Sequence, residues 1–178
     1  SELESDARRS AEITGNLRAE LGASASENLY ESAAGTGALS ASGSGSVIRL
    51  GITGKASFTG TVTAESGAAA EVTLTDTGVI EGSGTDSSLV FQSVGTGSTL
   101  DLDIGTGTAA TGDLKVSDGA EAALRISGTW IGAALLDSGT SKVSLSGGVW
   151  QLTGDSAVTT LVSNNSRIAF PAAGSGAF

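Results

Sequence analysis

Apolar and polar residues alternate along most of this chain in short runs with a period of two. The segments 72–75, 100–104 and 143–145 read VTLT, LDLDI and VSL, and Gly-rich segments such as 42–45 separate runs of this kind. A β-strand with one buried face shows this alternation, because successive side chains point to opposite sides of the strand. The pattern therefore predicts many short strands joined by Gly, Ser and Thr turns.

The same pattern recurs as an internal repeat. Residues 11–29 align with residues 56–74 without a gap, and nine of the positions are identical. Further copies begin at Thr111-Gly112 and, more weakly, at Thr153-Gly154. In each copy an apolar residue follows fifteen positions after the threonine: Leu29, Leu74, Ile126 and Ile168. Repeats at such spacing indicate stacked supersecondary units.

Glycines reveal a shorter period inside this repeat. They recur in two evenly spaced series: Gly15, Gly37, Gly60 and Gly82, then Gly132, Gly154 and Gly176. Gly82 and Gly132 are separated by slightly more than two such steps, so we place a few extra residues near Gly95–Gly107. The period of about 22 predicts an all-β fold, a parallel β-helix with three short strands per coil and about eight coils.

Stacked coils bury like residues on like, so the inward positions can be assigned. The residues expected inside the tube are Ile13, Phe58, Leu74, Phe91, Leu102, Leu124, Trp130, Leu145, Leu152, Ile168 and Phe170. We interpret Trp130 and Trp150 as core residues rather than ligand contacts. Residues 1–10 are the most charged stretch and are expected to form a short helix or a frayed start, because Ser1 and Glu4 resemble a capping box. Residues 11–178 are expected to form the β-helix.

Composition excludes several functions. The net charge is −10 and the sequence pI is about 4.2, so the chain lacks the basic surface that nucleic acid requires. Cys and His are both absent, which removes disulfides, thiolate metal sites and the usual general base. We expect no cofactor, no metal and no membrane insertion by this fragment, since no apolar run approaches the length of a membrane span.

One segment near the C-terminus resembles a known family. Residues 147–170 read GGVWQLTGDSAVTTLVSNNSRIAF and are similar to a segment near the C-terminal end of autotransporter passenger domains, in the pertactin-like and self-associating adhesin groups. The positions that carry the resemblance are Trp150, Leu152, Thr153, Gly154, Asp155, Ser156, Val158, Leu161, Ile168 and Phe170. The upstream Thr-Gly repeats resemble the ordinary coils of such passengers.

The resemblance implies a right-handed parallel β-helix on the surface of a Gram-negative bacterium, exported by type V secretion through an outer-membrane barrel. It also implies that the chain is a fragment, truncated before the barrel. The lack of Cys is consistent with passage through a narrow pore in unfolded form.

Two groups of residues in the sequence resemble parts of catalytic or metal-binding sites. Ser156 in Gly154-Asp155-Ser156 looks like a nucleophile, but no His can activate it, and Lys55, Lys115 and Lys142 show no special spacing. The densest acidic cluster contains Asp101, Asp103, Asp113 and Asp118. It lacks both the Gly-Gly-x-Gly-x-Asp repeat of calcium β-rolls and the clustered Lys and Arg of a lyase cleft. We interpret these residues as turn and surface residues.

Two functions from different classes stay open. The first is an adhesin or virulence-associated stalk, secreted or on the cell surface, that acts through host adhesion or autoaggregation and is not an enzyme. Its Ser- and Thr-rich faces could carry O-linked sugars. The alternative is the β-helix stem of a secreted protease or polysaccharide-active enzyme whose catalytic part lies outside this fragment. An inserted loop or subdomain would favour the enzyme, and the sequence shows no insertion longer than about ten residues.

Overall fold

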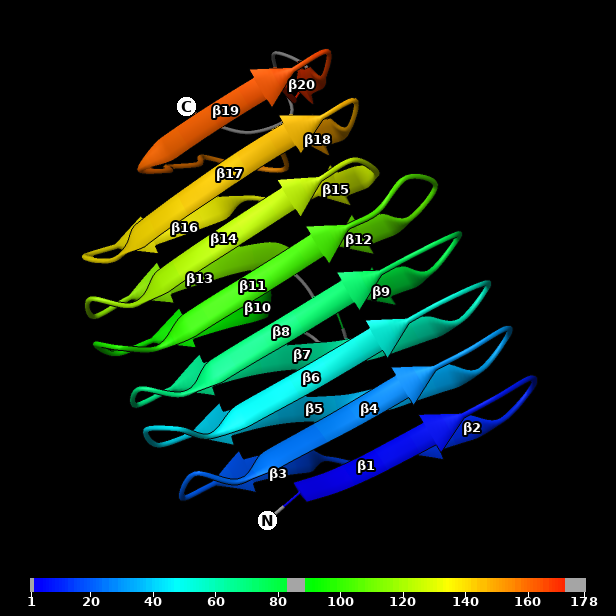
Figure 1. Cartoon of the computed structure of the whole chain (residues 1–178). Coiled ribbons are helices and arrows are strands. Elements are labelled where there is room, and N and C mark those ends of the chain that lie inside the picture. Colours follow the sequence, from blue (N-terminus) through cyan, green and yellow to red (C-terminus); the bar gives the residue numbers. More distant parts are fainter. Residues whose placement is uncertain (1, 83–88, 172–178) are drawn as a thin grey trace.

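The computed structural model describes residues 2–82 and 89–171, and every regular element in these ranges is a β-strand. The strands stack in parallel as a β-solenoid of about seven turns with about 22 residues per turn. Figure 1 shows one sheet crossing the front of the stack from β1 to β19, with the second sheet behind it. The predicted fold class is therefore confirmed. The expected eight coils correspond to eight rungs, which enclose only seven full turns.

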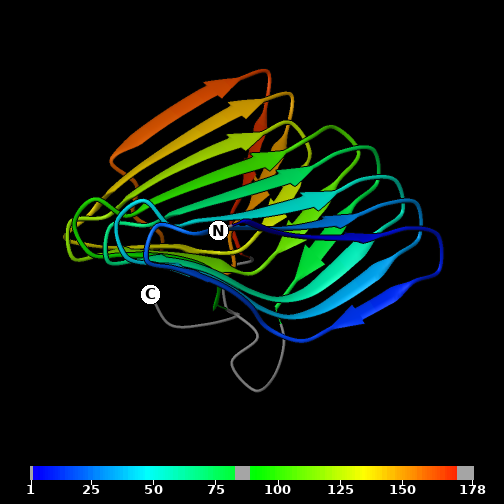
Figure 2. The same ribbon diagram turned by 60° about the horizontal axis from the view of Figure 1, so that its bottom comes forward.

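The front sheet has eight strands, one from each rung. Their order is β1 (Glu2–Ala7), β4 (Ser24–Leu29), β6 (Val47–Ile52), β8 (Ala69–Leu74), β11 (Thr99–Ile104), β14 (Glu121–Ile126), β17 (Thr140–Ser146) and β19 (Thr160–Asn164). Figure 2 shows that the strands of successive turns follow similar paths. One residue position thus becomes a column that runs through the whole stack.

The second sheet has twelve strands and divides into two branches. One branch contains β3 (Leu17–Glu20), β10 (Leu89–Val94), β13 (Asp113–Ser117) and β16 (Ala134–Asp137). The other contains β2 (Glu12–Thr14), β9 (Val79–Glu81), β12 (Ala109–Thr111), β15 (Thr129–Ile131), β18 (Val149–Gln151) and β20 (Arg167–Ala169). The long strands β5 (Ala34–Ser42) and β7 (Ser57–Glu65) span both branches. A turn therefore contains three short strands only where the second sheet contributes two short strands in place of one long strand.

A column of glycines lies where the two branches meet. Gly37 pairs with Gly60, and the N–H groups of Gly15, Gly112 and Gly132 each donate to the next rung at this place. A Cβ added at Gly60 would collide with the carbonyl oxygen of Gly37. Glycine is needed here because neighbouring backbones approach too closely for a side chain. The predicted glycine period is confirmed from Gly15 to Gly82.

A second turn that contains glycine follows the C-terminal ends of β3 and β7, where the chain leaves the twelve-stranded sheet. Gly22 and Gly67 have φ angles of 77° and 84°, and their N–H groups donate to the hydroxyls of Ser46 and Ser98 on the following rung. Each hydroxyl in turn donates to a main-chain carbonyl within its own turn. These buried serines satisfy turn groups that would otherwise lack a partner inside the stack.

Most of the predicted core is correct. Phe58, Leu74, Phe91, Leu102, Leu124, Trp130, Leu145 and Leu152 are buried. Ile13 and Ile168 are partly buried against the core, whereas Phe170 is 77% exposed and was wrongly placed inside. Thr14, Thr36 and Thr59 are successive partners, so the Thr-Gly copies at residues 14 and 59 lie two turns apart on one face, as expected.

The charged N-terminal segment is not helical. Residues 2–7 form β1, which pairs along its whole length with β4. The capping-box interpretation was wrong because Ala7 occupies the same buried column as Leu29, and pairing with the next rung outweighs a local helix signal. Ser1 lies outside the described residues. Within those residues no helix is long and apolar enough to cross a membrane.

The extra residues lie earlier than predicted. Ile80 pairs with Phe58, a sequence offset of 22, whereas Phe91 pairs with Val62, an offset of 29. Seven extra residues therefore precede Phe91, and only one more lies between Val94 and Thr99, where the offset becomes 30. The Gly-Thr-Gly pattern misled the assignment because it forms a turn of nearly normal length.

The last turns are shorter than the period suggests. Ile126 pairs with Leu145 and Leu145 with Ser163, so the sequence offset falls to 19 and then to 18. Gln151 and Leu152 consequently stack in the column that the Thr-Gly pair occupies in earlier rungs. The predicted fourth repeat copy at Thr153-Gly154 was therefore misaligned. Ile168 stacks on Trp150 in the second sheet and not on the Leu29 column. Gly176 lies outside the described residues.

The glycine column can be tested by Gly60→Ala. We expect a loss of about 1–3 kcal/mol or more in unfolding free energy, because the new Cβ must displace a main-chain carbonyl. Gly154→Ala is the matched control, since no atom lies within 4 Å of the position that its Cβ would take, and we expect a change within about 0.5 kcal/mol. Urea denaturation measures both. Equal stability of the two variants would contradict the close approach at Gly60.

The inward leucines can be tested by Leu74→Ala and Leu145→Ala. Both side chains are at most 2% exposed, so each variant should lose about 2–5 kcal/mol through an unfilled cavity. Leu3→Ala serves as the control because Leu3 is 57% exposed. Urea melts of the two core variants that coincide with wild type would show that these columns do not stabilise the stack.

Candidate functional site

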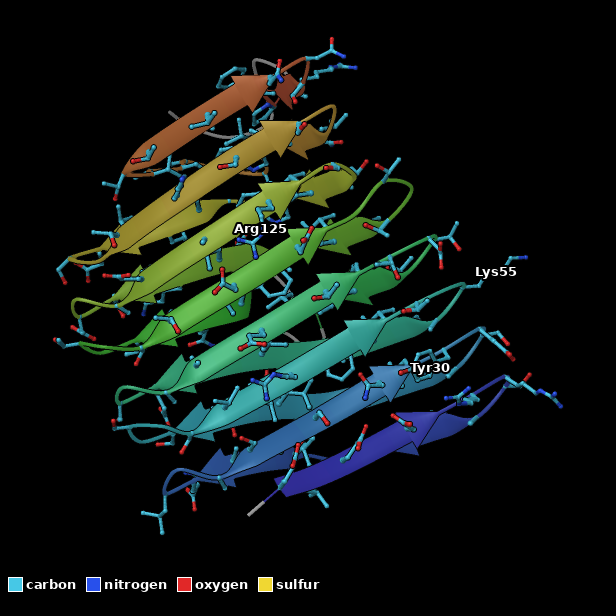
Figure 3. The ribbon with its side chains drawn as sticks, in the orientation of Figure 1. Tyr30, Lys55 and Arg125 are labelled. Carbon is cyan, nitrogen blue, oxygen red and sulfur yellow. The ribbon has the colours of Figure 1, made fainter. Side chains whose placement is uncertain are left out.

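The outer face of the eight-stranded sheet is a long polar surface. Its strands expose every second residue, and aligned positions form columns along the stack. One such column contains Glu4, Ser26, Arg49, Glu71, Asp101, Ala123, Lys142 and Thr160. Figure 3 shows Arg125 on this face, whereas Tyr30 and Lys55 lie near the turns at the strand ends.

Ion pairs between neighbouring rungs neutralise part of this face. Arg49 Nε lies 2.9 Å from Glu71 Oε2, and Arg125 lies 3.4 Å from an Asp101 oxygen and 3.7 Å from an Asp103 oxygen. All of these side chains are about half exposed, so each pair contributes less than about 1 kcal/mol. Their main effect is on the surface potential, because they place opposite charges side by side on neighbouring strands.

The four aspartates that lie close together in the sequence are separated in the structure. Asp101 and Asp103 lie on β11 in the eight-stranded sheet, whereas Asp113 lies on β13 in the other sheet and Asp118 follows it in a turn. Asp113 Oδ1 accepts hydrogen bonds from Ala133 N–H at 2.7 Å and from Thr153 Oγ1 at 3.2 Å. Within the described part of the chain, no three Asp or Glu side chains are grouped as a metal site would require.

Two depressions mark the outer surface near the C-terminal rungs. The smaller, of about 320 Å³, lies on the eight-stranded sheet above Ala123, with Asp101, Glu121 and Lys142 around it. The larger is a groove of about 590 Å³ beside β16. Its lining residues are Leu89, Asp113, Lys115, Ala134, Leu135, Leu136, Asp137, Asp155, Ser156 and Ala157. We call this larger depression the β16 groove.

The sequence analysis missed the β16 groove. Its signal is the segment 134–137, ALLD, where two adjacent leucines interrupt the alternation. Leu135 pairs with the outward Lys115 and is 44% exposed. Because one of two neighbouring strand residues must face outward, the second leucine indicates an apolar surface position.

The residues of the family-like segment do not form one cluster. Trp150 is buried and stacks on Trp130, with ring centroids 4.8 Å apart, and each indole N–H donates to a glycine carbonyl. Leu152 is buried and Val158 and Ile168 are partly buried, whereas Leu161 and Phe170 are exposed. Both tryptophans therefore fill the core, as interpreted from the sequence.

Among the polar residues of that segment, Ser156 bonds to main chain. Ser156 Oγ accepts a hydrogen bond from Ala134 N–H at 3.1 Å and donates to the carbonyl of Gly154 at 3.3 Å. Lys115 lines the same groove as Ser156. These two hydrogen bonds give Ser156 a positioning role at the start of β16, while Asp155 lies exposed at the rim.

Glu27 is a buried carboxyl group inside the stack. It is 5% exposed, and its Oε1 has no hydrogen-bond partner among the described residues. It occupies space left by Gly35, where an added Cβ would come within 2.6 Å of Oε1. Burial raises the pKa of the Glu27 carboxyl above its ordinary value of 4.5, because desolvation disfavours the charged form.

The repeat already contained a signal for Glu27. In the alignment of residues 11–29 with 56–74, Glu27 occupies the place of Val72. Its rung neighbours are Ser5 on β1 and Leu50 on β6, so the acid lies at an inward position of the column. The repeat in the sequence therefore already indicated an acidic residue at a position that is apolar in the other copy.

Glu27→Gln tests this buried acid. The raised folded-state pKa means that the native protein binds more protons than the unfolded chain between pH 4.5 and that raised value. Wild-type stability should therefore fall as pH rises through this window, whereas the Gln variant should lack that slope. We expect Glu27→Gln to be the more stable protein at pH 7, with the difference shrinking toward pH 4.5.

Chemical denaturation at several pH values measures this difference. The control is Glu4→Gln, an exposed residue on the neighbouring strand β1. A pH-independent difference between wild type and Glu27→Gln, or the same slope change for Glu4→Gln, would contradict the buried ionisation.

Comparisons with known proteins complete the description of these surfaces. A scan against protein-family models, a search of curated proteins and a search of solved structures each found no match. The structure of this chain establishes the β-solenoid fold. The function of the chain is argued from the surfaces described above.

Proposed function

We propose that this chain is a section of an autotransporter passenger that serves as an adhesive stalk on the outside of a Gram-negative cell. The observation that carries the proposal is the outer face of the eight-stranded sheet. Eight strands in register present aligned polar columns along the whole stack. Repeated weak contacts along such a face add up, so a solenoid can bind through area and shape without a catalytic constellation.

Small side chains are interspersed with charged ones on this face. Gly51, Thr73, Asp103 and Arg125 are successive members of one column, and two of these four are small. Hydroxyl groups can form hydrogen bonds with a second flat surface, either a host component or another copy of the chain. Ser and Thr at outward positions could also carry O-linked sugars.

The alternative is the stem of a secreted protease or polysaccharide-active enzyme whose catalytic part lies elsewhere. The seven extra residues before Phe91 are the main departure from the regular turns, and an insertion of this size is too short to fold as a catalytic subdomain. The described faces contain ion pairs between rungs and hydrogen-bonded hydroxyls. We therefore favour a chain whose own faces make the contacts over a stem that carries a catalytic insertion.

Self-association is tested by sedimentation across a salt series. The net charge of −10 repels copies at low salt, and salt screens this repulsion, so we expect association to increase with salt. Thr73→Arg places a long side chain on the outer face of β8 and should block face-to-face contact. Thr63→Arg is the matched control, because it makes the same change on β7 in the other sheet.

The outcomes separate the functions. Loss of association in Thr73→Arg but not in Thr63→Arg would support self-association through the outer face of the eight-stranded sheet. A monomer at every salt concentration would remove self-association and leave a host component as the partner. Hydrolysis of a glycan or peptide panel that Asp101→Asn or Asp103→Asn abolishes would overturn the stalk in favour of an enzyme.

A further inference from the structure

The β16 groove differs from the polar faces in having an apolar floor. Leu135 is 44% exposed on the outward side of β16, and Leu89, Leu136 and Ala157 line the same groove. Most other outward positions on the described outer faces are polar or small, and the comparably exposed Leu161 and Val162 lie on β19, outside the groove. A hollow of about 590 Å³ with an apolar base is large enough to hold one or two side chains of a partner.

The groove also follows an open edge of the twelve-stranded sheet. β16 pairs with β13 on one side only and is the last strand of its branch. Ala134 directs its N–H to Ser156 Oγ at 3.1 Å and its carbonyl to Ala157 N–H at 2.8 Å, both on the open side. Residues two apart in a strand direct their main-chain groups to the same side, so Leu136 presents its N–H and carbonyl to this edge.

The chain itself starts to cover the edge and then leaves it. Residues 156 and 157 bond to Ala134, but the following residues lead to β19 in the other sheet. On the side of β16 that faces away from β13, no strand among the described residues pairs with it. An uncovered edge of this kind accepts an extended chain, which supplies the missing main-chain hydrogen bonds.

The rim of the groove carries an excess of negative charge. Asp113, Asp137 and Asp155 line it together with one cation, Lys115. Within the described residues, none of the three carboxylates lies in an ion pair. The charge of the rim therefore favours a cationic occupant and disfavours an acidic one.

We propose that the β16 groove binds an extended peptide segment of a partner protein, with an apolar side chain over Leu135 and flanking Lys or Arg residues beside the carboxylates. The segment lies along the β16 edge and bonds to the main chain of Leu136. This site does not depend on the stalk function, because it uses neither the outer face of the eight-stranded sheet nor self-association.

The test is fluorescence anisotropy with a labelled Lys-Val-Leu-Val-Lys peptide. We expect saturable binding that weakens as salt rises, because the rim attracts the lysines. Asp137→Lys combined with Asp155→Lys should weaken binding about tenfold or more, and Leu135→Ser about fivefold. Both sets of positions are exposed or half-exposed, and circular dichroism verifies that the variants fold.

Two controls make the result specific. Glu4→Lys combined with Glu121→Lys changes the net charge equally on the other sheet, and it should leave binding within about twofold of wild type. The same peptide with alternate amides methylated should bind at least about fivefold more weakly, since it cannot complete the edge hydrogen bonds.

Several outcomes would overturn the proposal. These are the absence of saturable binding, equal weakening by the control charge reversal, and equal affinity for a Glu-Val-Leu-Val-Glu peptide. A dimer that Leu135→Ser dissociates, in protein that does not bind the peptide, would assign the groove to a second copy and also contradict it. The salt series with Thr73→Arg remains a separate test of the stalk.

Discussion

The structure depends on stacking rungs in register at the spacing of paired β-strands, about 4.8 Å. Every position must then tolerate an almost identical neighbour directly above and below. The glycine column shows the strictest form of this constraint, because at Gly37 and Gly60 the main chain of one rung fills the space where a side chain of the next would stand. The leucine and isoleucine columns show the favourable form, in which like side chains pack on like and exclude water.

The same constraint explains how exceptions are accommodated. Glu27 replaces an apolar residue in its column, and Gly35 on the facing sheet leaves the room that the carboxyl group occupies. Trp130 and Trp150 stack on each other while their indole N–H groups bond to glycine carbonyls. Most of the extra residues precede β10, and one produces a register shift inside β10 between Leu89 and Phe91. From Phe91 onward the strands again pair in register with the neighbouring rungs.

Surface properties follow from where the stacking is complete and where it stops. Along the eight-stranded sheet each rung continues the last, so the outer face is continuous and some of its charges pair between rungs. Beside β16 the chain leaves the sheet early, which exposes a strand edge, a leucine floor and three carboxylates together. The face suits repeated weak contacts, whereas the groove suits one extended segment.

The sequence by itself determined the strand type, the period and most of the core, because alternation and recurring glycines are local signals that stacking repeats in every turn. It could not place the extra residues before Phe91 or the shortened last turns, since turn lengths change the register without changing the alternation. It also misread residues 2–7, whose strand exists because β4 offers a partner. Only the tertiary structure separated Asp101 from Asp113, exposed Phe170 and assembled the β16 groove, because these depend on which rung lies beside which.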